Sequence, residues 1–100
     1  MSEDRISRYE RIRGQLLGLV IQLDERLTVQ QQTWAHEFLD ANELGLALEM
    51  LADWLSEDSR PVTAAERDTM LDLVDEMGMD DRVARALDLC PTMLARSEEV

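Results

Sequence analysis

The sequence predicts an all-α fold, organised as a single-domain bundle of about five helices. Its 100 residues are 45% hydrophobic, which is enough for one core, and 4% aromatic, so aliphatic residues and Met must fill that core. Two Pro and four Gly mark few turns. Apolar residues recur at spacings of three and four, which is the period of an amphipathic helix.

The first helix is expected over residues 4–27. Its core-facing side has apolar residues at helical spacing, namely Tyr9, Ile12, Leu16, Leu19, Val20, Leu23 and Leu27. Gly14 and Gly18 interrupt the middle of this helix, and we expect them to allow the close approach of a neighbouring helix.

Thr28 is suited to the N-cap of a second helix over residues 29–40, in which Trp34 and Phe38 lie one turn apart. Asn42 is expected to cap a third helix over residues 43–56.

The third helix has two contrasting sides. Leucines recur along its inward side at Leu44, Leu48, Leu51 and Leu55, and Trp54 lies at the edge of this row. On the opposite side Glu49, Asp53 and Glu57 follow one another at four-residue intervals, with Leu46 and Met50 among them.

A polar loop over residues 56–61 is followed by a fourth helix that ends near Met77. Thr63 and Glu66 fit a capping box at its start, and Gly78 fits the position just after its end. The residues expected to face inward are Met70, Leu73, Val74 and Met77, and those expected to face outward are Asp68, Asp72, Asp75 and Glu76.

A short fifth helix is expected over residues 80–89, with Val83, Ala86 and Leu87 inward. Pro91 ends it, and the tail from about residue 91 is expected to fray. No segment has the alternation of a strand, and residues 1–100 read as one helical domain.

The net charge is concentrated in one segment. Residues 36–81 contain fourteen Asp or Glu and two Arg, and they account for the whole net charge of −12. Such a field attracts a positively charged partner and opposes binding to nucleic acid or an anionic membrane. The charged N-terminus lacks a signal-peptide pattern, and no apolar run approaches the roughly 20 residues of a membrane span, so we expect a cytoplasmic protein.

The residues that could support catalysis or metal binding are few. His36, the only histidine, lies on the polar side of the second helix, and a catalytic base also needs an orienting partner and a nucleophile nearby. Asp40, four residues on, could pair with His36, but this is a common arrangement on a helix surface. Cys90 precedes Pro91 and is expected to be a small buried apolar residue. One His and one Cys cannot form a Cys/His zinc site, and the acidic run over residues 75–81 lacks the ligand spacing of a calcium loop. We therefore expect a non-enzymatic protein without metal or cofactor.

Apolar side chains within an acidic helix surface are more typical of an interface than of a solvated face. The third helix has this mixture, and the fourth adds a second acidic row, although the sequence leaves open whether both rows lie on one side of the molecule. The residues expected to bind a partner are Leu46, Glu49, Met50, Asp53, Glu57, Asp68, Asp72, Asp75 and Glu76.

Residues 38–55 contain the run Gly45-Leu46-Ala47-Leu48-Glu49 within an acidic helix. This segment resembles the core of the MafI family of bacterial immunity proteins. The resemblance covers about residues 37–87, half of the chain, and Asn42 stands where a Gly is expected in that family. The matching residues are Glu37-Phe38, Gly45-Leu46-Ala47-Leu48-Glu49, Val62-Thr63, Glu66 and Met77-Gly78-Met79.

This resemblance implies a small, acidic, helical protein of a polymorphic-toxin or contact-dependent inhibition system. Such a protein binds and neutralises a cognate toxin, often a nuclease with a basic active-site cleft, in the cell that produces it. A first alternative is an acidic helical adaptor that binds another basic protein. A second is a small helical enzyme, which would need His36 or Cys90 in a cleft with carboxylates.

Overall fold

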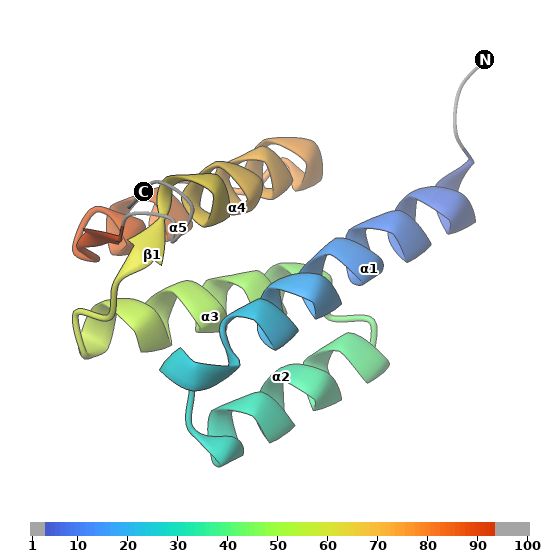
Figure 1. Ribbon diagram of the computed structural model, residues 1–100. Helices are drawn as coiled ribbons and strands as arrows, with labels where there is room; N and C mark the ends of the chain where they lie inside the picture. Colours follow the sequence, from blue (N-terminus) through green and yellow to red (C-terminus); the bar gives the residue numbers. More distant parts are fainter. Residues whose placement is uncertain (1–3, 94–100) are drawn as a thin grey trace, which may run out of the picture.

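The computed structural model describes residues 4–93, and the predicted all-α fold is confirmed for them (Figure 1). In chain order the elements are α1 (Arg5–Gln22), a 3₁₀ turn η1 (Asp24–Arg26), α2 (Val29–Asp40), α3 (Leu44–Glu57), β1 (Val62–Thr63), α4 (Ala64–Met77), α5 (Arg82–Leu87) and β2 (Thr92–Met93).

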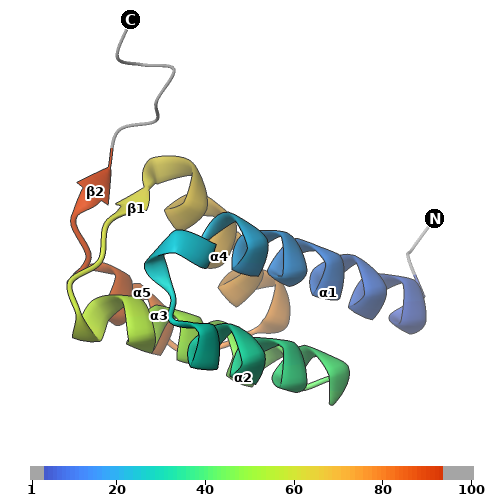
Figure 2. The same cartoon turned by 60° about the horizontal axis from the view of Figure 1, so that its bottom comes forward.

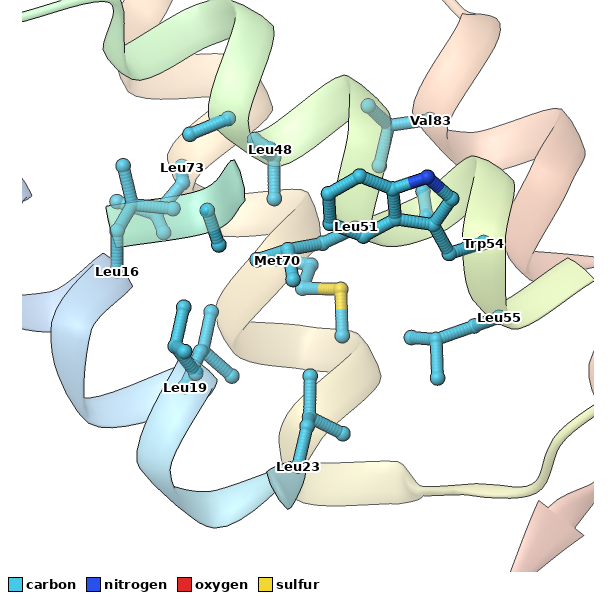
Figure 3. Close-up of a cluster of buried hydrophobic side chains, with 14 of the residues drawn as sticks. Leu16, Leu19, Leu23, Leu48, Leu51, Trp54, Leu55, Met70, Leu73 and Val83 are labelled. Atoms are coloured by element: carbon cyan, nitrogen blue, oxygen red, sulfur yellow. The ribbon is translucent and has the colours of Figure 1, made fainter. Parts of the chain in front are cut away.

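Helix α3 forms the centre of the molecule and packs against each of the other four helices in the described part of the chain. In the view of Figure 1 it passes between α2 below and α4 and α5 above. The predicted leucine side of α3 is confirmed, since Leu48, Leu51 and Leu55 are each 0% exposed. They meet core residues from α1 and α4, among them Leu16 and Met70, which are also buried (Figure 3).

Helix α1 ends at Gln22, earlier than expected, and η1 carries the chain on toward α2. The predicted inward residues from Ile12 to Leu27 are buried, but Tyr9 is exposed. Tyr9 lies in the first turns of α1, which project beyond the rest of the bundle (Figures 1 and 2). The expectation for Gly14 and Gly18 was wrong, because a Cβ at either position would meet no atom within 4 Å.

Helix α2 has the predicted bounds and the predicted cap. The Thr28 side chain accepts a hydrogen bond from the Gln31 backbone N–H, and the Gln31 side chain accepts one from the Thr28 N–H, which completes a capping box. The helix buries Ala35 and Leu39 against the core and leaves Trp34 44% exposed.

Asn42 does not cap α3, contrary to the sequence prediction. It adopts a left-handed backbone conformation with φ of 60°, and its side-chain oxygen accepts a hydrogen bond from Arg13 Nη2 at 2.8 Å. The residue before the helix is Glu43, whose side chain makes no capping hydrogen bond. Asn tolerates positive φ better than most residues, so it serves here in the turn between α2 and α3.

The predicted boundaries of α4 are confirmed. Thr63 and Glu66 form the capping box, and Gly78 ends the helix in the left-handed conformation with φ of 64°. Helix α5 is shorter than the expected 80–89, but Val83, Ala86 and Leu87 are buried as predicted.

Within residues 4–93, β1 and β2 form a short ladder that was not predicted from the sequence. Val62 pairs with Thr92 and Thr63 with Met93 in a parallel register. Arg67 supports this arrangement by donating hydrogen bonds to the Leu87 and Cys90 carbonyls and to Thr92 Oγ1. The tail is therefore ordered through residue 93 rather than frayed from residue 91; residues 94–100 lie outside the described part.

Candidate protein-binding surface

The outer face of α3 comprises Leu46, Glu49, Met50, Asp53 and Glu57, on the side of the helix that points away from the buried leucines. Leu46 is 38% exposed, whereas Leu48, two positions on, is 0% exposed. Glu57 is exposed, and Met50 is half-buried and packs against the core. This helix therefore presents apolar atoms beside carboxylates, the mixture expected from the sequence.

Arg82, the first residue of α5, lies against this outer face. Its Nη2 is 2.5 Å from Asp53 Oδ2 and its Nη1 is 3.5 Å from Glu49 Oε1. The hydrogen bond to Asp53, together with the two nearby carboxylates, raises the pKa of the Arg82 guanidinium. Two of the predicted partner-binding acids are thus already paired within the chain. Arg82 could not be assigned to this face from the sequence, because nothing local couples positions 29 and 33 residues apart.

An aromatic pair borders the outer face of α3 on the side of α2. The rings of Trp34 and Trp54 are stacked, with centroids 6.1 Å apart and an interplanar angle of 28°. Trp54 is buried, as Figure 3 shows, so it holds the exposed Trp34 ring in place. An exposed aromatic residue with a fixed orientation is a common anchor in protein interfaces. Trp34 was not among the residues predicted for the site, although aromatic residues on two neighbouring helices were a usable signal.

The second acidic row lies on α4. Asp68, Asp72 and Asp75 are exposed there, opposite the buried Met70 and Leu73. Because the apolar sides of α3 and α4 face the same core, their acidic sides point away from each other. The two rows therefore do not form one continuous surface.

Glu76 differs from the other acids of α4 because it is paired with α1. Its Oε1 is 3.0 Å from Arg11 Nη1, and Arg8 Nε lies 3.8 Å from its Oε2. The hydrogen bond from Arg11 lowers the pKa of Glu76, and the positive charges of Arg11 and Arg8 act in the same direction. Glu76 therefore helps to hold α4 against α1 and is a weaker candidate for binding a partner.

The residues considered for catalysis lie in unrelated environments. His36 is exposed on α2, whereas Cys90 is buried after α5, where its Sγ is 3.7 Å from the Ala86 carbonyl oxygen. Burial raises the pKa of the Cys90 thiol, which opposes formation of a nucleophilic thiolate. Among residues 4–93, no three His, Cys, Asp or Glu side chains gather in a way that could hold a metal ion.

Together these features define a small helical protein whose central helix exposes a mixed acidic and apolar face. In the described part of the chain, no helix has the length and apolar character required to cross a membrane. No family model matches the chain, and neither a curated protein nor a solved structure matches it.

Proposed function

We propose that this protein is an immunity protein that binds a cognate basic toxin and neutralises it by covering its active surface. A nuclease-type toxin suits this proposal, because an acidic inhibitor can occupy the basic cleft that would otherwise hold nucleic-acid phosphates. The resemblance of residues 37–87 to the MafI family supports the same role. Protection of the producing cell would place the protein in the cytoplasm.

The observation that carries the proposal is the outer face of α3. It combines the exposed Leu46 and the half-buried Met50 with the exposed carboxylate of Glu57, beside the stacked Trp34. Apolar groups and an aromatic anchor supply the contact area that is removed from water, and the carboxylates select a basic partner. Asp68, Asp72 and Asp75 point elsewhere, so they contribute to attraction over a distance rather than to the same contact.

The test begins by identifying the gene beside this one; if it encodes a toxin domain, that domain is purified as a catalytically inactive variant. Glu57→Arg and Leu46→Ala are each expected to weaken binding at least about fivefold in a calorimetric titration, because an interface anchor contributes more than about 1 kcal/mol. Asp88→Arg is the matched control for the charge reversal, since Asp88 is exposed at the C-terminal end of α5.

Binding by all three variants at wild-type affinity would exclude the outer face of α3 as the site. Absence of any complex with the wild-type chain would reject the immunity role toward that toxin, and binding to a basic protein of another kind would favour the adaptor. His36→Ala is expected to protect toxin-expressing cells fully, because covering a surface requires no proton transfer. Loss of protection in a folded His36→Ala variant would contradict the occlusion mechanism.

A further inference from the structure

A groove with a volume of about 640 Å³ lies at the opposite end of the molecule from the β1–β2 ladder. Its lining residues come from the first turns of α1, the N-terminal end of α3 and the C-terminal end of α4. Figure 2 shows the first turns of α1 projecting beyond the other helices. Its lining combines two arginines with an apolar floor and comprises Arg5, Arg8, Tyr9, Ile12, Asn42, Leu44, Gly45, Met77 and Met79.

The groove is the uncovered continuation of the core-facing side of α1. Farther along the helix, this side carries buried residues such as Ile12 and Leu16. One to two turns earlier, the same side carries Arg5, Arg8 and Tyr9 above the floor of Leu44 and the two methionines, and no element of the described chain closes the space. Flexible methionine side chains allow such a floor to adapt to the shape of a ligand.

The polar groups of the groove differ in what they already bind. The Arg8 guanidinium is already bound to α4, because it donates a hydrogen bond to the Glu76 carbonyl oxygen. The side chain of Arg5, the first residue of α1, makes no hydrogen bond or ion pair with any residue between 4 and 93. The side-chain oxygen of Asn42 accepts from Arg13, which leaves its amide N–H groups free to donate. The groove therefore offers hydrogen-bond donors to an anion above an apolar floor.

We propose that this groove binds a segment of a partner protein in which one carboxylate lies between apolar side chains. Charge complementarity assigns the carboxylate to Arg5, whose planar guanidinium can bind both of its oxygens. The apolar side chains would cover Met77, Met79 and Leu44. The groove is open along one side and so leaves much of a small ligand exposed, whereas a peptide segment continues beyond it. This surface is separate from the outer face of α3 and does not depend on the toxin-binding role.

The proposal is tested by adding the peptide Ac-Ser-Leu-Leu-Glu-Leu-Ser-NH₂ to the intact chain. The methyl signals of Met77 and Met79 are followed by NMR, and the same peptide with Gln in place of Glu is the matched probe. We expect a saturable shift of both methyl signals and about tenfold or more weaker binding of the Gln peptide, because charge-assisted hydrogen bonds are about twice as strong as neutral ones.

Two variants change the groove by independent means. Arg5→Ala removes the guanidinium and is expected to weaken binding of the Glu peptide as much as the Gln substitution does. Gly45→Leu fills the space, because a Cβ at Gly45 would meet only the Met79 side chain, at 3.9 Å. Arg85→Ala is the control, since Arg85 is exposed on α5 and does not line the groove. Unchanged melting temperatures identify variants that remain folded.

Saturable binding that is lost in Arg5→Ala and Gly45→Leu but kept in Arg85→Ala would support the proposal. No saturable shift at millimolar peptide, equal binding of the Gln peptide, or unchanged binding to Gly45→Leu would each overturn it. Shifts of the same methyl signals by decanoate but not by the peptide would also overturn it, because they would assign the groove to a small amphiphile.

Discussion

Arg26 and Glu66, forty residues apart in the sequence, form a two-pronged ion pair with N–O distances of 2.6 and 2.8 Å. Glu66 is 2% exposed, and its Oε1 also accepts a hydrogen bond from the Thr63 backbone N–H. Arg26 donates further hydrogen bonds to the carbonyls of Pro61 and Gln22. This pair joins the end of α1 and η1 to the start of α4, and thereby fixes the two halves of the bundle against each other.

Removing the buried carboxylate should be strongly destabilising. Glu66→Ala leaves the Arg26 guanidinium without its partner in a site where Arg26 is mostly buried, and we expect a loss of about 3–5 kcal/mol in the free energy of unfolding. Urea denaturation measures this change. The exposed pair between Arg85 and Asp81 is the control, since Asp81→Asn should cost less than about 1 kcal/mol. Equal effects of the two substitutions would show that burial of the Glu66 pair has no energetic consequence.

The same pair makes stability dependent on pH. Burial by itself would raise the pKa of Glu66, but the hydrogen bonds from Arg26 and Thr63 and the charge of Arg26 outweigh it and lower the pKa below its ordinary value of 4.5. A carboxyl with a depressed folded-state pKa stabilises the fold above its unfolded pKa, and this contribution is lost as the pH falls through the folded pKa.

Wild type should therefore exceed Glu66→Gln in stability by a constant margin near neutral pH, and the margin should shrink below about pH 4.5. Denaturation of both proteins from pH 7 to pH 3 measures the margin, and the many other acids cancel in the comparison. A margin that grew toward low pH would contradict the assigned direction of the pKa shift.

Two leucines of α3 test the orientation of that helix. Leu48 is 0% exposed and Leu46 is 38% exposed. Leu48→Ala is expected to cost roughly 2–5 kcal/mol through the cavity it leaves, and Leu46→Ala less than about 1 kcal/mol. Thermal unfolding gives the stability of both variants, and titration with the toxin domain should show weaker binding for Leu46→Ala. A severe folding defect in Leu46→Ala alone would mean that the helix faces the other way.

Arg82 should act as an internal competitor for a basic partner. Arg82→Ala frees the carboxylates of Glu49 and Asp53, so we expect association with the toxin domain to become several-fold faster at low salt and the gain to fade as salt rises. Stability should fall by less than about 1 kcal/mol, because the pair is exposed. Stopped-flow fluorescence measures the association rate.

Arg85→Ala is the matched control for Arg82→Ala, since both substitutions remove one positive charge from α5. Arg85 pairs with Asp81, whereas Arg82 pairs with the outer face of α3. Equal acceleration of association in both variants would show that the change in net charge alone explains the effect. Slower association in Arg82→Ala would show that Arg82 itself contacts the partner.

The ion pair between Arg82 and Asp53 makes Asp53 a poor position for a charge reversal on the outer face of α3. Reversing Asp53 to Arg would place two guanidiniums together, because Arg82 lies 2.5 Å from the Asp53 carboxylate. A loss of binding in such a variant could result either from the changed interface or from displacement of α5, and the measurement would not separate the two causes. Glu57 is exposed and forms no ion pair with another described residue, so it gives the cleaner reversal.

The sequence by itself determined the features that depend on neighbours a few residues away. The capping boxes at Thr28 and Thr63, the left-handed Gly78 and the division of α3 into the side of Leu48 and the side of Leu46 are of this kind. Each rests on hydrogen bonds or periodicity within one or two helical turns, so the local sequence specifies it.

Only the tertiary structure decided which distant residues meet. The pairing of Arg26 with Glu66, the contact of Arg82 with Glu49 and Asp53, and the ladder between Val62 and Thr92 all join segments 29 or more residues apart. The groove beneath α1 likewise exists because that helix extends farther than the helices packed against it. Such contacts follow from how the helices pack, and an isolated helix with the same sequence carries no signal for them.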